Sequence, residues 1–313
     1  MYQKRVILHT DIGGDIDDFW ALVMLLRQSA WLKLEMILTD TWNAVARAAV
    51  CEKILAGTGF EQTVLIGAGI QDDDREITHG EWIRGYDMSR YPGRFRKDGV
   101  AAMIELIEAS PEPVTLISIG PATSLAEALR IAPGIAGKVH FVGMFGSINR
   151  RYDGGTGAEF EFNVKQDIPA CRKIFTTPWL SFVNTPLDTC AAVVLEGEFF
   201  RRIAESDDPL LRKLMECNAC FLKYQAGGKD VPAPRRTTLL CDTVAIHLAS
   251  SRRFLHMEIL KLRVTDQGLT VRDDISGTPV DTALSWTDLE GFKRFLTDTL
   301  TARNNDSRTQ ERE

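Results

Sequence analysis

Residues 6–22 read VILHTDIGGDIDDFWAL and place four carboxylates between two apolar runs. The first run, residues 6–8, is apolar and partly β-branched, as expected of a buried strand, and the second begins at Phe19. Glycines at positions 13 and 14 allow a sharp turn between the two runs. The stretch therefore predicts a strand, a tight acidic turn and a helix, in that order.

The same alternation of strand-like and helical runs continues along the chain. Strand-like runs fall at residues 4–10, 33–40, 63–69, 114–120, 138–146 and 180–185, and helical runs fall at 19–29, 43–57, 99–110, 123–133 and 168–177. Apolar strands that alternate with helices are typical of a mostly parallel sheet with helices on both faces. We therefore predict an α/β fold with a Rossmann-like open sheet and a ligand site at the carboxyl ends of the strands.

Domain organisation follows from length and composition. The chain has 313 residues, of which 44% are hydrophobic, and it shows no internal repeat and no linker. We predict a single domain over residues 1–301. Residues 223–236, KYQAGGKDVPAPRR, are rich in Gly, Pro and charge and are expected to form a lid-like loop. Residues 302–313 lack apolar anchors and are expected to form a disordered tail.

Composition also excludes several classes of protein. The net charge of -6 argues against a nucleic-acid binder, which usually carries a basic face. No apolar run approaches the roughly 20 residues that span a bilayer, and the N-terminus does not resemble a signal peptide, so we expect a cytoplasmic protein without a membrane partner. Cys217 and Cys220 form a C-x-x-C pair, but no second pair stands at zinc-ligand spacing. We expect these cysteines to pack in the core as free thiols.

Helix capping alone does not explain the four carboxylates of the acidic turn. Asp11 follows the first strand, and Asp17 and Asp18 begin the first helix. A helix N-terminus favours one or two carboxylates, but four at one edge of a sheet would repel each other unless a cation intervened. Ligands that are all oxygen favour a hard cation, either Ca²⁺ or Mg²⁺. The turn thus predicts a metal site.

The residues of the turn argue against three alternative functions. The dinucleotide fingerprint G-x-G-x-x-G is absent. An EF-hand needs a 12-residue loop between two helices, whereas a strand precedes this turn. A phosphatase of the D-x-D type would need a nucleophilic Asp where this chain has His9.

The stretch HTDIGGDIDD, residues 9–18, resembles the N-terminal signature D-x-D-P-G-x-D-D of nucleoside hydrolases of the inosine-uridine type, lengthened by two residues. Asp11, Asp17 and Asp18 match the motif acids, and Asp15 is additional. The resemblance covers nearly the whole chain. Further matches follow in order at Asn43, at His79, in ISIGPATSLAEAL, at Met144, in EFNVKQD (residues 161–167), at Asp242, and in a C-terminal β-hairpin and helix.

This resemblance implies a calcium-dependent N-ribosyl hydrolase that releases a free base and ribose. The Ca²⁺ ion would be held by the side chains of Asp11, Asp18 and Asp242 and by the main-chain carbonyl of Ile119. Mg²⁺ is the less favoured ion. Asp17 would act as general base on a metal-bound water, which attacks C1′ through an oxocarbenium-like state.

The family's substrate contacts also transfer to residues of this chain. Asn43, Glu161 and Asn163 would bind ribose hydroxyls, and Met144 would touch the sugar. Asn43 could instead only cap the helix that it begins, and Asp167 is expected to cap the helix after it. By resemblance, the protein is expected to form a homodimer or homotetramer that acts on a small nucleoside-like substrate.

The chain departs from the family at the end of the site that would hold the base. Cys241 stands where many purine-active members have a His that protonates the leaving base, and a thiol is a poor acid for that task. Gly155 replaces a ribose-contacting Asn, and His9 replaces the first motif Asp. His79 is a candidate substitute acid, and Trp82, with Trp42 and Tyr86, offers aromatic surface for stacking.

The sequence therefore leaves the leaving group open, and three hypotheses remain. The first is hydrolysis of a ribonucleoside or nucleoside-like compound. The second is a non-catalytic member of the fold that binds ribose or a nucleoside without turnover. The third is a hydrolase or ribosyl transferase that acts on a modified base or a specialised metabolite.

Overall fold

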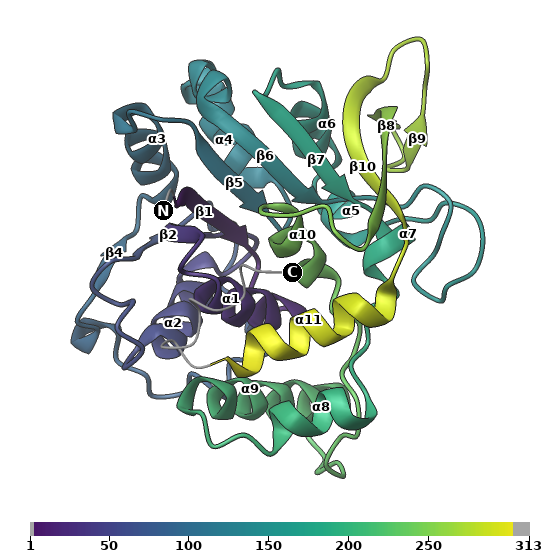
Figure 1. Ribbon diagram of the computed structural model, residues 1–313. Coiled ribbons are helices and arrows are strands. Elements are labelled where there is room, and N and C mark those ends of the chain that lie inside the picture. The colour runs from purple at the N-terminus through teal and green to yellow at the C-terminus, as the bar shows by residue number, and fades with distance from the viewer. Residues whose placement is uncertain (1–2, 303–313) are drawn as a thin grey trace.

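Ten strands form one sheet, in the order β4-β3-β2-β1-β5-β6-β7-β10-β8-β9, in the computed structural model, which describes residues 3–302 (Figure 1). The strands are β1 (Lys4–Thr10), β2 (Leu32–Thr39), β3 (Leu65–Ala68), β4 (Arg94–Arg96), β5 (Val114–Ser118), β6 (Val139–Met144), β7 (Ser181–Thr185), β8 (Leu255–Val264), β9 (Thr270–Arg272) and β10 (Thr278–Trp286). Neighbours from β4 to β10 pair in parallel, and only β8 and β9 run antiparallel to their partners. The predicted α/β class and mostly parallel sheet are confirmed.

Helices cover both faces of this sheet. They are α1 (Asp17–Arg27), α2 (Ala44–Leu55), α3 (Gly99–Ala109), α4 (Thr123–Ile131), α5 (Phe162–Gln166), α6 (Ile168–Thr176), α7 (Leu187–Cys190), α8 (Gly197–Ala204), α9 (Pro209–Gln225), α10 (Cys241–Leu248) and α11 (Leu289–Thr301). One hydrophobic core packs α1, α2, α10 and α11 against the sheet, and a second packs α3, α4 and α6 against the other face. Helices α8 and α9 form an outer layer beside α1 and α11.

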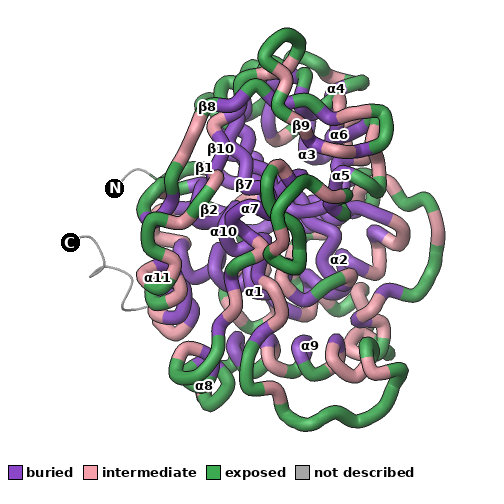
Figure 2. The backbone as a smooth tube through the Cα atoms, turned by 90° about the vertical axis from the view of Figure 1, so that its right-hand side faces the viewer, coloured by how far each residue is buried: buried purple, intermediate pink, exposed green. Residues whose placement is uncertain are grey.

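Helices α1 and α10 are the most deeply enclosed (Figure 2). Every residue of α10 is buried, and all of α1 is buried except Asp17. A helix that is apolar on all sides needs cover on all sides, which α1 obtains from the sheet, α9, α10 and α11. The two helix N-termini that carry the predicted acidic ligands are therefore rigidly placed.

The six strand runs expected from the sequence are present, and the further strands differ in part from expectation. Strand β4 has three residues, two of them Arg, so its composition does not indicate a strand. Strand β8 lies between β9 and β10 and pairs with both. In the place of the predicted C-terminal hairpin, β8 pairs antiparallel with β9 on one side and with β10 on the other. Strands β9 and β10 do not pair with each other.

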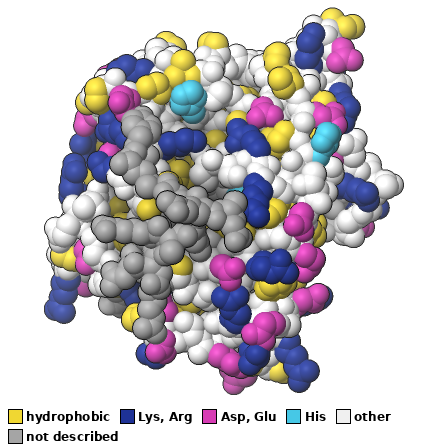
Figure 3. Space-filling model, viewed as in Figure 1, with side chains coloured by type: hydrophobic (Ala, Val, Ile, Leu, Met, Phe, Trp, Pro, Cys, Tyr) yellow, Lys and Arg dark blue, Asp and Glu magenta, His cyan; other side chains and the backbone are white. Residues whose placement is uncertain are grey.

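The remaining general predictions concern cysteines, surface charge and the tail. All six cysteines are free, and Cys217 is fully buried in α9 while Cys220 is partly buried. On the face in Figure 3, basic side chains lie among acidic ones and do not gather into a basic patch. Within residues 3–302 no helix is long and apolar enough to cross a membrane. The predicted tail is residues 302–313, of which residues 303–313 lie outside the described residues.

Candidate active site

Three neighbouring parallel strands end at one edge of the sheet and carry predicted site residues there. Asp11 directly follows β1, Ile119 follows β5, and Met144 ends β6. The N-termini of α1 and α10 reach the same edge, and the pocket between them has a volume of about 810 Å³. This is the carboxyl end of the strands, where ligands of open α/β sheets bind.

Three carboxylates converge in this pocket. Asp17 and Asp18 begin α1, Asp242 lies in the first turn of α10, and one oxygen of each lies within 4.8 Å of the others. Asp18 and Asp242 are buried, and the Thr10 hydroxyl donates to Asp18. Burial, followed by repulsion from neighbouring carboxylates, raises the pKa of all three groups well above its ordinary value. We call Asp17, Asp18 and Asp242 the carboxylate triplet.

Asp11 lines the same pocket but is not a member of the triplet. Its main-chain carbonyl accepts a hydrogen bond from Arg47, which also donates to the carbonyls of Ile12 at 3.0 Å and Thr41 at 2.8 Å. The Arg47 side chain is fully buried. Thus one guanidinium from α2 holds the backbone of the acidic turn and places a positive charge beneath it. No sequence pattern indicates this role for Arg47.

The turn after β5 is packed tightly on Asp11. A Cβ added to Gly120 would lie 2.7 Å from the Asp11 backbone nitrogen and 3.0 Å from its Oδ1. The first distance is shorter than real Cβ contacts and the second is at their lower limit, and the backbone nitrogen cannot rotate away. The G-P turn after Ile119 therefore needs glycine at this position because of close approach.

The Gly120→Ala variant is expected to displace the Asp11 backbone and to lower the free energy of unfolding by about 1–3 kcal/mol, the usual cost of overpacking. Thermal unfolding monitored by circular dichroism measures this effect. The matched control is Gly137→Ala in the 3₁₀ helix Pro133–Lys138, where an added Cβ meets no atom within 4 Å. Equal unfolding curves for the two variants would contradict the steric argument.

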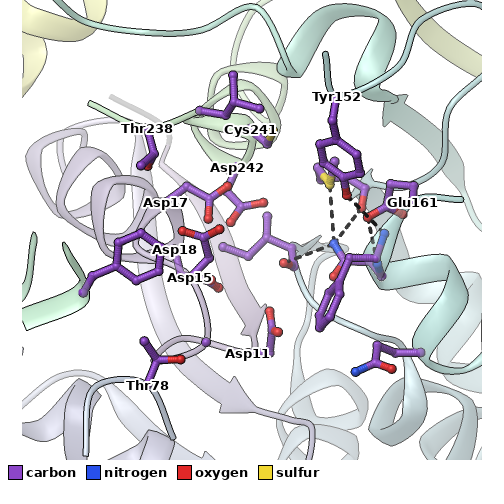
Figure 4. Close-up of a pocket in the computed structure, with 18 of the residues that line it drawn as sticks. Asp11, Asp15, Asp17, Asp18, Thr78, Tyr152, Glu161, Thr238, Cys241 and Asp242 are labelled. Carbon is purple, nitrogen blue, oxygen red and sulfur yellow. Dashed lines mark hydrogen bonds between the residues drawn. The ribbon is translucent and has the colours of Figure 1, made fainter. Parts of the chain in front are cut away.

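Glu161 lies across the pocket from the triplet (Figure 4), and Asn163 lines the same pocket. Glu161 is the N-cap of α5, and its carboxylate accepts from the backbone N–H groups of Gly146 at 2.9 Å, Asn163 at 2.7 Å and Val164 at 3.1 Å. Burial nevertheless raises the pKa of Glu161 to about 7. Its carboxylate is thus held rigidly, with much of its hydrogen-bonding capacity already used by the backbone.

The Asn163 amide links two strand ends. Its Nδ2 donates to the Met144 carbonyl at 3.1 Å and lies 3.4 Å from the Ile119 carbonyl. Ile119, Met144, Glu161 and Asn163 all line the pocket. The resemblance assigns Ile119 to the metal and the other three to the sugar, and these roles stay predictions. The Ile119 carbonyl has two lone pairs, and the 3.4 Å contact with Asn163 engages at most one of them.

Three predicted substrate contacts do not line the pocket. Asn43 caps α2 instead: its Oδ1 accepts from Ala46 N–H at 3.0 Å, and its Nδ2 reaches the Arg75 carbonyl at 3.4 Å. The Trp82 ring packs beneath Lys53, 4.2 Å from the ammonium nitrogen, and its Nε1 points to Glu216. The Asn43 and Trp82 side chains are thus engaged by protein groups outside the pocket.

His79 is the third predicted substrate contact that lies outside the pocket lining. Its side chain is fully buried between Phe19 and Phe221, with ring centroids 4.4 Å and 5.9 Å away. Phe221 lines the pocket and His79 does not. Burial lowers the pKa of His79 to about 4, so the imidazole is neutral at pH 7. It therefore cannot replace the missing acid at the leaving base.

Cys241 does line the pocket, at the start of α10. It is buried, and its thiol interacts with that of Cys190. Gly155 is half-buried in the segment between β6 and α5 and does not line the pocket, although Tyr152 and Phe160 of the same segment do. Asp167 caps α6 through Ala170 N–H at 2.9 Å, as predicted.

His9 supports the site from behind. Its two ring nitrogens contact Ser118 Oγ and Asp40 Oδ2, each at 2.9 Å, and the side chain is fully buried. Asp40 in turn accepts from the backbone N–H of Ser124 at 2.7 Å. His9 thereby ties β1 to β5 and to the turn after β2, next to Asp11.

Sequence reasoning missed most of the aromatic lining. Besides Trp42, the pocket is lined by Tyr152, Phe160, Phe162, Phe221 and Tyr224. Four of these rings are unusually accessible, with exposed fractions of 38% for Tyr152, 50% for Phe160, 45% for Phe162 and 58% for Tyr224. Exposed aromatic side chains that gather around a cavity mark a binding surface. Their spacing along the chain carries no periodic signal, so only the fold reveals the cluster.

Comparison with known proteins places this chain in a family. Residues 6–294 match the family described as inosine-uridine preferring nucleoside hydrolase. The chain is 31% identical over 236 residues to the non-specific ribonucleoside hydrolase RihC of Salmonella schwarzengrund, and the match covers 72% of each protein. It is also 30% identical over 155 residues to a protein of Schizosaccharomyces pombe, covering 49% of this chain and 45% of that one.

Solved structures agree with the fold. A plant nucleoside hydrolase, PpNRh1, superposes with a TM-score of 0.76 at 21% identity, over 96% of this chain and 100% of that one. An inosine-uridine preferring nucleoside hydrolase from Bacillus anthracis gives a TM-score of 0.73 at 19% identity, over 96% and 99%. The chain belongs to the inosine-uridine preferring nucleoside hydrolase family. The predicted family and fold are confirmed, and the class of enzyme is that of N-ribosyl hydrolases.

Proposed function

We propose that this protein hydrolyses the N-glycosidic bond of a ribonucleoside or nucleoside-like compound with the help of a Ca²⁺ ion. The observation that carries the proposal is the carboxylate triplet, whose oxygens lie within 4.8 Å of one another on the floor of an 810 Å³ pocket. Ordinary packing does not account for such a triplet, because each buried charge costs free energy unless a partner neutralises it.

The residues present fit a hard cation. The triplet offers carboxylate oxygens only, and the Ile119 carbonyl lines the same pocket. Burial first, and then repulsion among the three carboxylates, raises their pKa values, and a divalent ion would offset both effects. We assign Asp11, Asp18, Asp242 and the Ile119 carbonyl as ligands. We prefer Ca²⁺ to Mg²⁺ because Ca²⁺ accepts several carboxylate and carbonyl oxygens in flexible geometry, whereas Mg²⁺ is usually held by one or two carboxylates. When bound, the ion supplies Lewis acidity that lowers the pKa of water and orients hydroxyl groups.

Side chains of the protein would then accept the proton of the attacking water and orient the sugar. Asp17, partly exposed at the first position of α1, accepts the proton of the attacking water as general base. Asn163, Glu161 and Met144 line the same pocket and orient the sugar. The bond between C1′ and the base nitrogen breaks through an oxocarbenium-like state as the water oxygen bonds to C1′.

Domain organisation, the lid and the assembly belong to the same proposal. We propose that residues 1–301 act as a single domain and that residues 223–236 act as a lid. Tyr224 and Gln225 at the start of this segment, and Thr238 and Leu239 just after it, line the pocket. Lys223, at the start of the segment, forms an ion pair with Glu81 at 3.1 Å. This ion pair links the segment to the turn that contains Glu81. Homodimer or homotetramer assembly and a cytoplasmic location stay predictions.

A reducing-sugar assay tests the proposed function directly. The protein is incubated with inosine, uridine, cytidine, adenosine and modified nucleosides, with CaCl₂ or with EDTA. Release of pentose that requires the metal is the expected result. Tight nucleoside binding without pentose release would instead support a non-catalytic member of the fold, and a sugar adduct in place of free pentose would identify a transferase.

A further inference from the structure

Resting on the proposed function, we infer that the preferred substrate is a ribonucleoside whose base carries a permanent positive charge, such as an N-ribosylpyridinium. If the sugar hydroxyls lie on the carboxylate floor, the base on C1′ points toward the mouth of the pocket. The mouth is lined by aromatic rings and overlooks an excess of negative charge. Three observations carry this inference.

The first is the aromatic wall itself. Phe221 and Tyr224 come from α9, and Tyr152 and Phe162 come from the segment between β6 and α6. A cationic ring is attracted to aromatic faces by their quadrupole, by about 0.5–2 kcal/mol for each well-placed ring. Aromatic enclosures of this kind are the usual protein solution for binding organic cations.

The second observation is that this wall already binds cations of the protein. The Lys165 ammonium nitrogen lies 4.4 Å from the centroid of Phe160, and the Arg75 guanidinium carbon lies 4.5 Å from that of Trp42. Both rings line the pocket. The environment therefore favours positive charge over aromatic faces, and the rings of Tyr152, Phe162 and Tyr224 remain for a ligand.

The third observation concerns charge and the fate of the leaving group. Six carboxyl groups line the pocket, from Asp11, Asp15, Asp17, Asp18, Glu161 and Asp242, and Lys165 is the sole basic residue among the described lining residues. Even with a divalent ion bound, the acidic groups are in excess. A base with a fixed positive charge gains from this field both on approach and when bound.

Bond cleavage itself is also matched to a cationic base. When the C1′–N bond breaks, its electron pair moves to the base nitrogen. On a neutral base this nitrogen must receive a proton, whereas on a cationic base the electron pair cancels the charge and the base leaves neutral. The water oxygen bonds to C1′ and its proton goes to Asp17 in either case, so a cationic base needs no second acid.

The described lining of the pocket offers no imidazole or guanidinium as the donor of that second proton. No His or Arg is found among its described lining residues, and His79 lies behind Phe221. Lys165 places its ammonium on Phe160 and donates to the Gln267 carbonyl at 3.3 Å. The Tyr152 hydroxyl accepts the Phe162 N–H at 3.2 Å, and burial raises its pKa, so it is a weak acid. A leaving group that needs no protonation suits this arrangement.

The test compares hydrolysis of N-ribosylnicotinamide with that of inosine and uridine, all with the same CaCl₂ concentration. We expect kcat/KM for the cationic nucleoside to exceed that for either neutral one by about tenfold or more, which corresponds to roughly 1.4 kcal/mol. Inosine or uridine turned over as well as the cation would overturn this inference and leave the proposed function standing. Absence of base release from all three would overturn both.

Recognition must be separated from the intrinsic lability of a pyridinium glycoside. 1-Methylnicotinamide, which is methylated on the ring nitrogen and permanently cationic, and neutral nicotinamide are therefore compared as competitive inhibitors, and the cation is expected to bind at least about fivefold more tightly. The Tyr224→Leu variant should reduce this ratio by about 2- to 30-fold. Tyr86→Leu, an aromatic substitution outside the pocket lining, is the control and should preserve the ratio. Equal inhibition by both compounds would refute a cation-selective wall.

Discussion

The Asp17→Asn variant is expected to lower kcat by about 10²- to 10⁴-fold, the range that general-base catalysis usually contributes. Asp17 is the most accessible member of the triplet, at the first position of α1, so it is the member best able to reach an attacking water. Asn keeps the volume and one oxygen but cannot accept the proton. Steady-state kinetics on whichever nucleoside the assay identifies measures the loss.

Two further measurements make this prediction specific. Asp15→Asn changes an exposed carboxylate of the same turn that lies outside the triplet, and it should alter kcat by less than about threefold. The Ca²⁺ concentration for half-maximal activity distinguishes a base from a ligand. If Asp17→Asn weakens Ca²⁺ activation as strongly as Asp18→Asn does, Asp17 is a ligand and the base must be sought elsewhere, first at Asp11.

Removal of the metal is expected to abolish hydrolysis and to destabilise the protein. With Ca²⁺ at about 100 times its Kd, binding to the folded state alone contributes about 2.7 kcal/mol, which corresponds to a rise in Tm of roughly 5 °C for a domain of this size. Differential scanning fluorimetry in EDTA and in CaCl₂ measures the shift. The Asp242→Asn variant, which removes one triplet member, should lose most of it.

The size of this shift should depend on pH, and the sign follows from the raised pKa values. The triplet carboxyls bind protons more tightly in the folded, metal-free protein than in the unfolded chain, where Asp titrates near about 3.9. Stability of the metal-free protein therefore falls as the pH rises from about 4 through the raised values, and Glu161, with a pKa of about 7, extends this window. Stabilisation by Ca²⁺ should grow over the same window. A shift that is constant from about pH 5 to pH 8 would contradict a cation held by the triplet.

The fold was largely predictable because its signals are local. Each buried parallel strand is a short apolar run, and each helix between strands shows its own pattern, as in residues 4–10 and 19–29. The short charged strand β4 escaped because three residues with two Arg look like a loop. The pairing of β8 with both β9 and β10 escaped because pairing is a property of the folded sheet and not of the segments.

The candidate site was predictable only where a motif fixes the backbone. Asp11, Asp17, Asp18 and Asp242 stand at strand ends or helix starts, so placing the element places the carboxylate. Asn43, His79 and Trp82 share the right segments, but their side chains cap a helix or pack against neighbours that the segments do not reveal. The aromatic lining comes from loops and from α9, whose approach to the pocket depends on tertiary packing.

The triplet joins distant parts of the chain: Asp17 and Asp18 belong to the first helix and Asp242 to α10, which packs directly on it. Contacts between residues so distant in sequence form late, because the intervening chain must be ordered before they can meet. The local half of the site, with Arg47 holding the backbone of the acidic turn, needs only the first two strands and helices. An ion at the triplet would therefore act after the rate-limiting step of folding: it would slow unfolding and leave the folding rate nearly unchanged.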